Sequence, residues 1–276
     1  MEPKRVVVVT GCSTGIGRCV ALGLSERGYR VFATARRQDH VDELNALGLE
    51  SFLVDLTDSG SIRAFVAKLL YMANGKIYGL FNNAGYGQPG AVEDLNRQAL
   101  QEQFEILFGT MELTNLILPS MRKRKCGRII QNSSVLGLTA MKFRGAYVAN
   151  KFALEGLTDS MRLELDGSGI HVSLIEPGPI ISRFRANSYT AFKKHIQSSN
   201  SVHQAAYAAM EKRLTKEGPA APFTLHPEAV LKKVIAALES KTPKIRYYVT
   251  IQTHVFALLR RALPFCTLDW VVKKLV

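Results

Sequence analysis

The sequence predicts a doubly wound α/β fold built on one parallel sheet. Short apolar runs alternate along the chain with longer stretches of helical periodicity or composition. The runs are almost continuous in β-branched and other apolar residues, as expected of strands that are covered on both faces. A glycine-rich turn, TGCSTGIG, joins the first run to the first helical stretch, as in sheets that bind a ligand at the carboxyl ends of their strands.

Each apolar run is a predicted strand, and each periodic stretch between two runs is a predicted helix. The strands are expected at residues 6–10, 30–35, 51–55, 77–83, 128–134, 171–177 and 245–250. The helices are expected at residues 16–27, 41–47, 61–73, 95–125, 146–165 and 226–240. Gly28 follows the first helix and Gly167 the long fifth one, where glycine adopts a left-handed terminal conformation most easily.

The length of 276 residues allows one large domain or two small ones, and the unbroken alternation favours a single domain over residues 1–276. Residues 177–226 interrupt this alternation of strands and helices. They contain scattered Gly, Pro and Ser residues, weak periodicity and no clear strand. Long insertions of this kind in a compact fold are usually lids or binding loops. We therefore expect residues 177–226 to cover a substrate.

Residues 252–276 form a C-terminal extension, expected to be helical, that combines bulky apolar residues with basic ones and is interrupted by Pro264. It has no uncharged run of the length needed to span a bilayer. It is expected either to lie on an anionic lipid surface, to cover the substrate pocket, or to form ordinary core. Its basic residues are Arg260, Arg261, Lys273 and Lys274.

The formal net charge of +13 is concentrated late in the chain, where residues 191–276 hold 14 Lys and Arg against 5 Asp and Glu. No nucleic-acid motif or stacking platform accompanies these charges, so we expect no nucleic-acid partner. Three explanations of the basic residues remain: contact with an anionic membrane surface, binding of an anionic cofactor, or solubility. The four cysteines have no zinc-ligand spacing, which predicts neither metal nor disulfide. The N-terminus lacks a signal-peptide core, which predicts a cytoplasmic protein.

The stretch TGCSTGIG, residues 10–17, directly follows a predicted buried strand. Glycines leave room for a diphosphate to approach the backbone amides at the N-terminus of the next helix, where the helix dipole favours negative charge. The spacing GxxxGxG alone would also fit a tight strand-to-helix turn, but its position predicts a nucleotide site. The expected contacts are Gly11, Ser13, Thr14, Gly15, Ile16 and Gly17.

The second predicted strand ends in ATARR, with Ala35 where dinucleotide-binding folds often have an acidic residue. Arg36 and Arg37 follow, and guanidinium groups suit the 2′-phosphate of NADP(H). The alternative is two solvated arginines at a helix start. Further contacts to the cofactor are expected at the ends of the next two strands, from Asp55 and Leu56 beside the adenine and from Asn83, Ala84 and Gly85 of the NNAG stretch.

Five motifs in order, TGCSTGIG, NNAG, SSVLG, YVANK and EPGP, resemble those of the short-chain dehydrogenase/reductase family over residues 5 to about 183. The C-terminal third resembles the branch that contains hydroxysteroid and retinol dehydrogenases. The resemblance implies a Rossmann-type fold and a homodimer or homotetramer. It also implies that Tyr147 is the catalytic acid/base, that Lys151 lowers its pKa and binds the nicotinamide ribose, and that Ser134 holds the substrate oxygen.

Chemical reasoning from the residues agrees with these roles. Tyr147 and Lys151 are four residues apart, so they share one face of a predicted helix. Ser134 ends a predicted strand, and strand carboxyl ends form the ligand crevice in such sheets. Hydride transfer to a carbonyl creates an alkoxide, which needs a proton donor within hydrogen-bond reach. After the sixth strand, the family pattern brings EPGPIIS near the nicotinamide through Pro177, Gly178, Ile180 and Ser182, although an ordinary proline turn is the alternative.

One segment departs from the family pattern. The family usually carries F-x-x-N-x-x-G in the long helix before the fifth strand, whereas this chain reads FEILFGT from Phe104 to Thr110. The asparagine is missing, Asn115 is too far along to replace it, and the interval from Phe104 to Gly109 is one residue short. A deletion would rotate the rest of the helix by about 100° unless a bulge absorbs it. A proton relay behind Lys151 is therefore in question.

The leading hypothesis is an NADP(H)-dependent oxidoreductase that interconverts a carbonyl and an alcohol on an apolar substrate of steroid, retinoid or lipid-like character. The aromatic residues of the predicted lid support this choice. Two alternatives remain, a catalytically impaired NADP(H)-binding scaffold or sensor and a peripheral membrane-binding module. The aromatic lid residues are Phe184, Tyr189, Phe192 and Tyr207.

Overall fold

The computed structural model describes residues 4–219 and 221–275, and within them seven strands form one parallel sheet. The strand order is β3-β2-β1-β4-β5-β6-β7, and every neighbouring pair is parallel. This order confirms the predicted doubly wound class. The strands are β1 (Val6–Val9), β2 (Arg30–Ala35), β3 (Glu50–Leu53), β4 (Ile77–Asn82), β5 (Gly127–Asn132), β6 (Ile170–Glu176) and β7 (Arg246–Tyr248).

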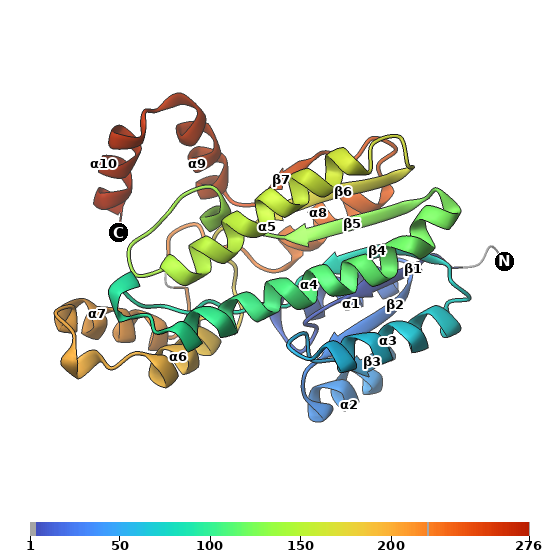
Figure 1. Ribbon diagram of the computed structural model, residues 1–276, viewed down its shortest axis with the longest axis horizontal. Coiled ribbons are helices and arrows are strands. Elements are labelled where there is room, and N and C mark those ends of the chain that lie inside the picture. The colour runs from blue at the N-terminus through green and yellow to red at the C-terminus, as the bar shows by residue number, and fades with distance from the viewer. Residues whose placement is uncertain (1–3, 220, 276) are drawn as a thin grey trace.

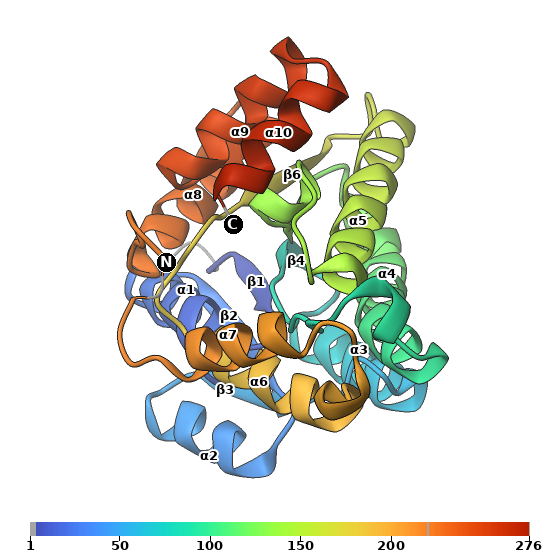
Figure 2. The ribbon, with the colours of Figure 1, turned by 90° about the vertical axis from the view of Figure 1, so that its left-hand side faces the viewer.

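Helices cover both faces of the sheet, as Figures 1 and 2 show. The valines of β1 divide between the two layers, because Val7 and Val9 pack on one side and Val6 and Val8 on the other. All four are buried, which explains why β1 reads as an uninterrupted apolar run. One layer holds α1 (Gly15–Glu26), α2 (Gln38–Ala46) and α8 (Glu228–Glu239), and the other holds α3 (Ser59–Met72), α4 (Arg97–Arg124) and α5 (Gly145–Glu164).

The predicted lid, residues 177–226, contains two helices that the sequence did not indicate, α6 (Phe184–His195) and α7 (Gln204–Thr215). They lie beyond the carboxyl ends of the strands (Figures 1 and 2). Three 3₁₀ turns complete the helical elements near this end of the sheet, η1 (Val92–Asp94), η2 (Val135–Gly137) and η3 (Ser198–Asn200). Packing against the body, rather than a strong apolar stripe of their own, stabilises helices as short as α6 and α7.

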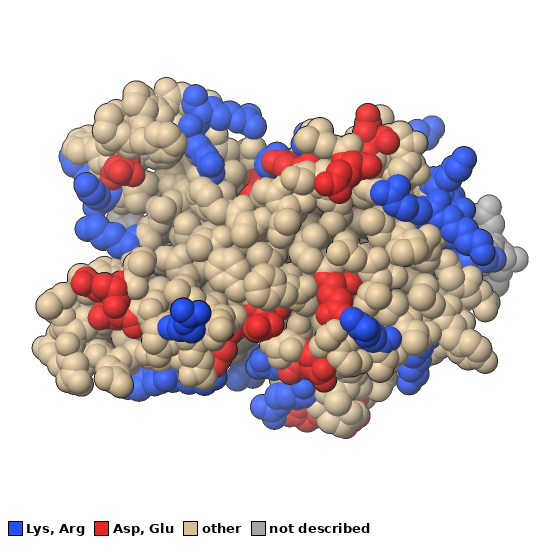
Figure 3. Space-filling model, viewed as in Figure 1, with Lys and Arg blue, Asp and Glu red and all other residues tan. Residues whose placement is uncertain are grey.

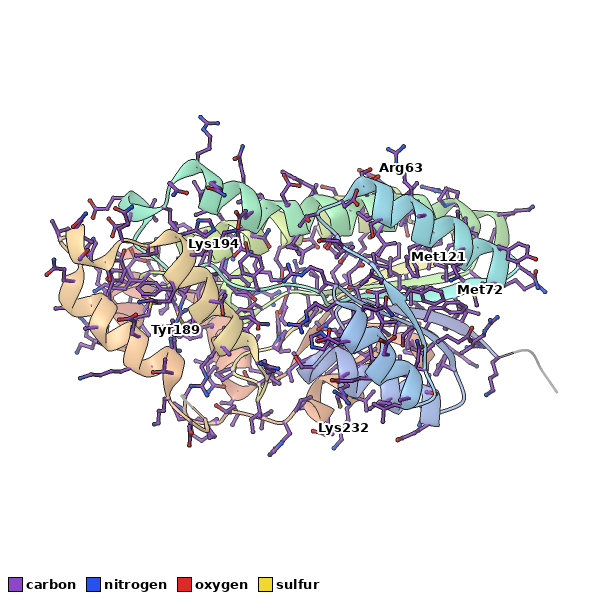
Figure 4. All side chains as sticks on the ribbon, turned by 90° about the horizontal axis from the view of Figure 1, so that it is seen from below. Arg63, Met72, Met121, Tyr189, Lys194 and Lys232 are labelled. Carbon is purple, nitrogen blue, oxygen red and sulfur yellow. The ribbon has the colours of Figure 1, made fainter. Side chains whose placement is uncertain are left out.

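Aromatic lid residues fix α6 and α7 to the body of the protein. Phe192 and Tyr207 are fully buried in a separate apolar cluster, and the Tyr207 hydroxyl accepts a hydrogen bond from the Ala91 amide at 3.0 Å. Figure 4 shows Lys194 of α6 reaching toward α4, where its ammonium pairs with Glu102 at 2.7 Å. Phe192 and Tyr207 therefore hold the lid in place.

The C-terminal extension forms a helical pair, α9 (Ile251–Ala262) and α10 (Phe265–Leu275), which is interrupted next to Pro264 as predicted. Its buried side chains Phe256, Leu268 and Val272 pack against Val135 and Leu136, directly after β5. The extension therefore covers one side of the carboxyl edge of the sheet (Figure 1). Within the described ranges, no helix combines the length and apolar character that crossing a bilayer requires.

A buried ionic cluster joins β7 to β6 and α5. The Arg246 guanidinium contacts Asp159 at 2.7 Å, Glu155 at 3.1 Å and Glu176 at 3.1 Å. Burial and the neighbouring Glu155 raise the pKa of Glu176 to about 8, and Arg246 acts in the opposite direction. Burial also raises the pKa of Glu155. The folded protein therefore holds protons on this pair that the unfolded chain releases.

We expect the cluster to make the protein less stable as the pH rises. An unfolded glutamate titrates near pH 4.3 and Glu176 near pH 8, so the folded state binds more protons between these values, and the free energy of unfolding falls as pH increases across them. Glu176→Gln, which stays neutral, is expected to remove most of this decline in urea unfolding measured at several pH values. Glu239→Gln, whose carboxylate pairs with Arg27 at the surface, is the control and is expected to keep the decline. An unchanged slope in Glu176→Gln would contradict the assignment.

Candidate active site

The glycine-rich turn after β1 is fastened to the NNAG segment after β4. Gly11 has a φ of +70°, and a side chain there would place its Cβ 2.7 Å from the Cα of Ala84. The Asn83 side-chain amide donates to the Thr10 carbonyl at 2.9 Å, and the backbone amides of Asn83 and Ala84 donate to the Thr10 hydroxyl at 2.9 and 3.0 Å. The predicted Asn83, Ala84 and Gly11 are thus held together, and Gly85 follows them at the surface.

The N-terminus of α1 offers backbone amides without a side-chain cap. Thr14 occupies the N-cap and makes no side-chain capping hydrogen bond. A Cβ at Gly15 would come 2.8 Å from the Cβ of Ser182, and one at Gly17 would come 2.2 Å from the Gly11 carbonyl oxygen. Ser13 and Ile16 complete the turn and are half-buried. Uncapped amides beside a surface that only glycine permits fit the diphosphate of a dinucleotide.

The two arginines after β2 differ in their partners. Arg37 forms an ion pair with Asp39, with Nε and Oδ1 3.0 Å apart, and this pairing lowers the pKa of Asp39. Arg36 makes no hydrogen bond or ion pair with any other described residue, so its guanidinium is available to an added anion. At the end of β3, the Asp55 carboxylate accepts hydrogen bonds from Thr57, and the adjacent Leu56 is buried.

The predicted catalytic residues meet just beyond the carboxyl end of β5. Ser134 is the N-cap of η2, where its hydroxyl accepts a hydrogen bond from the Leu136 amide at 3.1 Å. Tyr147 lies in the first turn of α5 and interacts with the Ser134 hydroxyl. The Lys151 ammonium lies 5.6 Å from the centre of the Tyr147 ring and donates to the Asn132 carbonyl at 2.8 Å. The structure thus brings serine, tyrosine and lysine side chains together.

The segment after β6 runs between this cluster and the glycine-rich turn. The Pro177 carbonyl accepts a hydrogen bond from the Val135 amide at 2.8 Å. Gly178 lies against Thr250, because a Cβ there would approach the threonine Oγ1 to 2.2 Å. Ile180 forms an isolated bridge with the lid at Leu225, and Ser182 abuts Gly15. All four residues predicted to lie near the nicotinamide are therefore on one loop between the two halves of the site.

A family model described as short chain dehydrogenase matches residues 5–192. The chain belongs to the short-chain dehydrogenase/reductase family. The Escherichia coli K12 protein named as the uncharacterized oxidoreductase YbbO is 40% identical over 271 residues, which cover 98% of this chain and 94% of the relative. Human 17-beta-hydroxysteroid dehydrogenase type 1 is 31% identical over 264 residues, covering 90% and 78%. A short-chain dehydrogenase structure from Streptomyces avermitilis superimposes with a TM-score of 0.76 at 27% identity, covering 100% and 96%.

These matches confirm the predicted family, its Rossmann-type fold and the kinship with hydroxysteroid dehydrogenases. The protein is therefore an oxidoreductase of the short-chain dehydrogenase/reductase family, whose members use nicotinamide cofactors. Among its described residues, no three metal-ligating side chains gather into a metal site, and the four cysteines are free.

Burial dominates the proton affinities in this dehydrogenase/reductase. Loss of solvent raises the pKa of Tyr147 to about 12, while the Ser134 hydroxyl and the Arg144 charge lower it by less. Burial also lowers the pKa of Lys151 to about 8, against the opposing charge of Glu155. The Arg144 charge lowers the phenol pKa, and the same effect of Lys151 stays a prediction. In the protein as described, the phenol carries its proton at neutral pH.

Helix α4 contains no bulge in the FEILFGT segment. It runs without interruption from Arg97 to Arg124, and Gly109 crosses β3's end so closely that a Cβ would come 1.8 Å from the Leu56 carbonyl oxygen. Counted back from this glycine, the position of the family asparagine is occupied by Ile106. Counted from Phe104, the interval to Gly109 is still one residue shorter than the family pattern.

A small cavity of about 20 Å³ lies between Ile106 and Lys151. Asn82 and Asn132 also line it, and the side-chain oxygen of each is buried without a hydrogen-bond partner. A cavity of this size holds about one water molecule, and a water needs two to four polar partners. The side-chain oxygens of Asn82 and Asn132 and the Lys151 ammonium group supply these polar partners.

An aromatic ring from the lid covers Tyr147. The Phe184 and Tyr147 rings are 5.4 Å apart at 64°, and a Cβ at Gly87 would lie 2.8 Å from Phe184 and 3.4 Å from Tyr147. Tyr147 and Val148 also pack against the cluster formed with α9 and α10. The C-terminal extension therefore covers the site, one of the alternatives that the sequence had left open.

Sequence reasoning missed three residues that shape the site. Thr10 organises the NNAG segment, Gln103 accepts from the Gln88 amide at 2.7 Å and borders the cavity, and Arg144 acts on the phenol pKa. Arg144 had a sequence signal, since it precedes Tyr147 by one helical turn. Gln103 had no sequence signal, because its place beside the cavity depends on contacts with residues that are distant in the sequence.

Tyr147→Phe is expected to lower the turnover of carbonyl substrates by about 100-fold or more, because phenylalanine lacks the hydroxyl group that donates a proton to the substrate oxygen. The reaction is followed as loss of NADPH absorbance with a panel of apolar ketones and aldehydes. NADPH is expected to raise the melting temperature of the variant as it does that of the parent. Tyr71→Phe, at a highly exposed tyrosine, is the matched control. Full activity in Tyr147→Phe would rule out this residue as the acid.

Proposed function

We propose that this protein is an NADP(H)-dependent oxidoreductase that interconverts a carbonyl and an alcohol on an apolar molecule. The meeting of Ser134, Tyr147 and Lys151 beside a glycine-lined helix N-terminus supports this activity most strongly. Human 17-beta-hydroxysteroid dehydrogenase type 1, a relative over most of the chain, is named for a steroid. We propose a steroid, retinoid or lipid-like substrate here, lying against Phe184.

The side chains suit reduction of a carbonyl. A bound nicotinamide supplies the hydride, and the remaining tasks fall to the protein. Ser134 donates a hydrogen bond to the substrate oxygen, and Tyr147 transfers its hydroxyl proton to that oxygen as negative charge develops there. The raised phenol pKa keeps this proton in place at neutral pH. The Lys151 ammonium binds ribose hydroxyls, and Phe184 shields the phenol from water.

The cavity beside Lys151 answers the objection raised by the missing helix asparagine. We propose that one water molecule fills it, bound by the Asn82 and Asn132 oxygens, and returns a proton toward Lys151 and Tyr147. The relay then rests on asparagines at the ends of β4 and β5 and not on helix α4. This arrangement favours an active enzyme over the alternative of a cofactor-binding scaffold or sensor.

We propose that Arg36 selects NADP(H) by binding its 2′-phosphate. Arg36→Ala is expected to raise the KM for NADPH by about tenfold or more, since a hydrogen bond to a charged group contributes about 1.5–3 kcal/mol. The KM for NADH is expected to stay within about twofold. Arg37→Ala is the matched control with a smaller effect, because its guanidinium already pairs with Asp39. Equal effects of both variants on NADPH and NADH would refute phosphate recognition by Arg36.

A peripheral membrane contact is a second proposed property, favoured by the outer surface of the C-terminal extension. Phe265 is 84% exposed and Trp270 is 58% exposed, although other residues of α9 and α10 are buried. Figure 3 shows lysines and arginines around this part of the molecule. Exposed aromatic rings between basic side chains suit the interface of an anionic bilayer.

Phe265→Ser with Trp270→Ser is expected to lower binding to vesicles containing phosphatidylserine by about tenfold or more, because two aromatic side chains lose their burial in lipid. Leu163→Ser, at an exposed leucine of α5, is the control and is expected to bind like the parent. Cosedimentation measures both. Equal binding of parent and double variant would exclude this surface as the contact.

We also propose a homodimer or homotetramer in which α4 and α5 face another subunit. Phe108, Phe152 and Leu157 are exposed on these helices. Figure 3 shows a broad area without charged side chains over α4 and α5. An exposed apolar area of this kind marks a surface that another protein covers.

A further inference from the structure

The short turn that begins at Ser134 is bonded to the C-terminal extension. Ser134 caps η2, and the last carbonyls of a helical turn have no partner within it. Arg260, in the last turn of α9, provides that partner. Its Nη1 donates to the Leu138 carbonyl at 2.8 Å and to the Gly137 carbonyl at 3.3 Å. The Arg260 guanidinium therefore completes the turn whose first residue is the serine of the proposed active site.

The same guanidinium contacts α5, the helix that carries Tyr147 and Lys151. The Arg260 Cζ lies 4.9 Å from the centre of the Phe152 ring, and Phe152 directly follows Lys151 in the chain. A cation over an aromatic face is attracted by the quadrupole of the ring. Arg260 thus links the turn that holds the serine hydroxyl to the helix that holds the phenol and the ammonium group.

The turn η2 packs closely on α5. A Cβ at Gly137 would lie 2.7 Å from the Ser133 hydroxyl oxygen and 2.9 Å from Oε1 of Glu155, a residue of α5. The Glu155 carboxylate is itself held by the Arg246 guanidinium at 3.1 Å. Close packing limits how near the two elements can approach, and the contacts of Arg260 with both of them oppose their separation.

The apolar contacts between η2 and the extension cannot replace these hydrogen bonds. Val135 and Leu136 pack against Phe256 of α9, and the burial of apolar surface is non-directional. Hydrogen bonds, in contrast, need defined lengths and angles. The orientation of the turn, and with it the direction of the Ser134 hydroxyl, therefore depends on the polar contacts at its end.

We propose that Arg260 is a positioning residue of the active site, which holds the Ser134 hydroxyl at the place that the reaction at Tyr147 requires. This inference rests on the proposed carbonyl chemistry, and it gives the C-terminal extension a part in turnover beyond covering the site. Arg260 acts through Ser134 and not on the substrate. Misplacement of a group by about 1 Å can lower a rate by about 100-fold, so a small movement of the turn is sufficient.

A double-mutant cycle in the full-length protein tests this role, with NADPH at saturation and an apolar ketone or aldehyde. Arg260→Gln is expected to lower kcat by about tenfold and to change KM by less than about twofold, because the serine hydrogen bond strengthens in the transition state. In the Ser134→Ala background the same substitution is expected to lower kcat by less than about twofold, because the hydroxyl that Arg260 positions is absent. Arg260→Lys retains a cation that donates hydrogen bonds and is expected to recover most of the activity.

Arg261→Gln is the matched control. Arg261 is the next residue, it is exposed, and it forms no hydrogen bond or ion pair with another described residue. Its substitution removes the same charge from the same helix and is expected to change kcat by less than about twofold. The proposal is overturned if both glutamine variants have the same kcat, or if Arg260→Gln lowers kcat equally with and without the Ser134 hydroxyl.

Hydrogen exchange measured by mass spectrometry separates a failure of this proposal from a failure of the proposed function. The Leu136 and Gly137 amides donate to the Ser134 hydroxyl and carbonyl at 3.1 and 2.9 Å. Arg260→Gln is expected to speed the exchange of these amides in the NADP⁺-bound protein by about tenfold, while exchange in α4 stays as in the parent. Faster exchange without turnover of any carbonyl by the parent would show that Arg260 fixes the turn and would refute the proposed chemistry. Unchanged exchange would refute the positioning role even if carbonyls are reduced.

Discussion

A chain of hydrogen bonds across three strand ends connects the catalytic lysine to the glycine-rich turn. Lys151 donates to the Asn132 carbonyl after β5, and the Asn132 side chain donates to Asn83 after β4. Asn83 in turn donates to the carbonyls of Thr10 and Gly11 after β1. Each group in this chain is fixed by the next, so helix α5 and the N-terminus of α1 keep one relative position. The geometry of every other site residue depends on that position.

Desolvation gives the site its chemical character. Tyr147 gains affinity for its proton and Lys151 loses affinity, both mainly because water is excluded from them. Phe184 and the α9–α10 cluster both contact Tyr147 and contribute to this exclusion. The lid and the C-terminal extension therefore set the protonation state of the phenol as well as access to it. A bound cofactor with its own charges adds to this balance.

The sequence predicted the strands and the catalytic side chains because both depend on local pattern. The strands are buried on both faces, so apolar runs identify them, and five ordered motifs place Ser134, Tyr147 and Lys151 at strand ends and on one helix. The helices α6 and α7 escaped prediction because tertiary contacts of Phe192 and Tyr207 stabilise them. The packing of Gly109 against Leu56 also escaped prediction, because the two residues are far apart in the sequence.

The sequence could not show that Arg144 lacks a hydrogen-bond or ion-pair partner among the described residues, because its possible partners are distant in the sequence. Its charge lowers the phenol pKa, while burial raises it by more. The balance of these two effects leaves the phenol with its proton at neutral pH. This is the protonation state that a proton donor in carbonyl reduction requires.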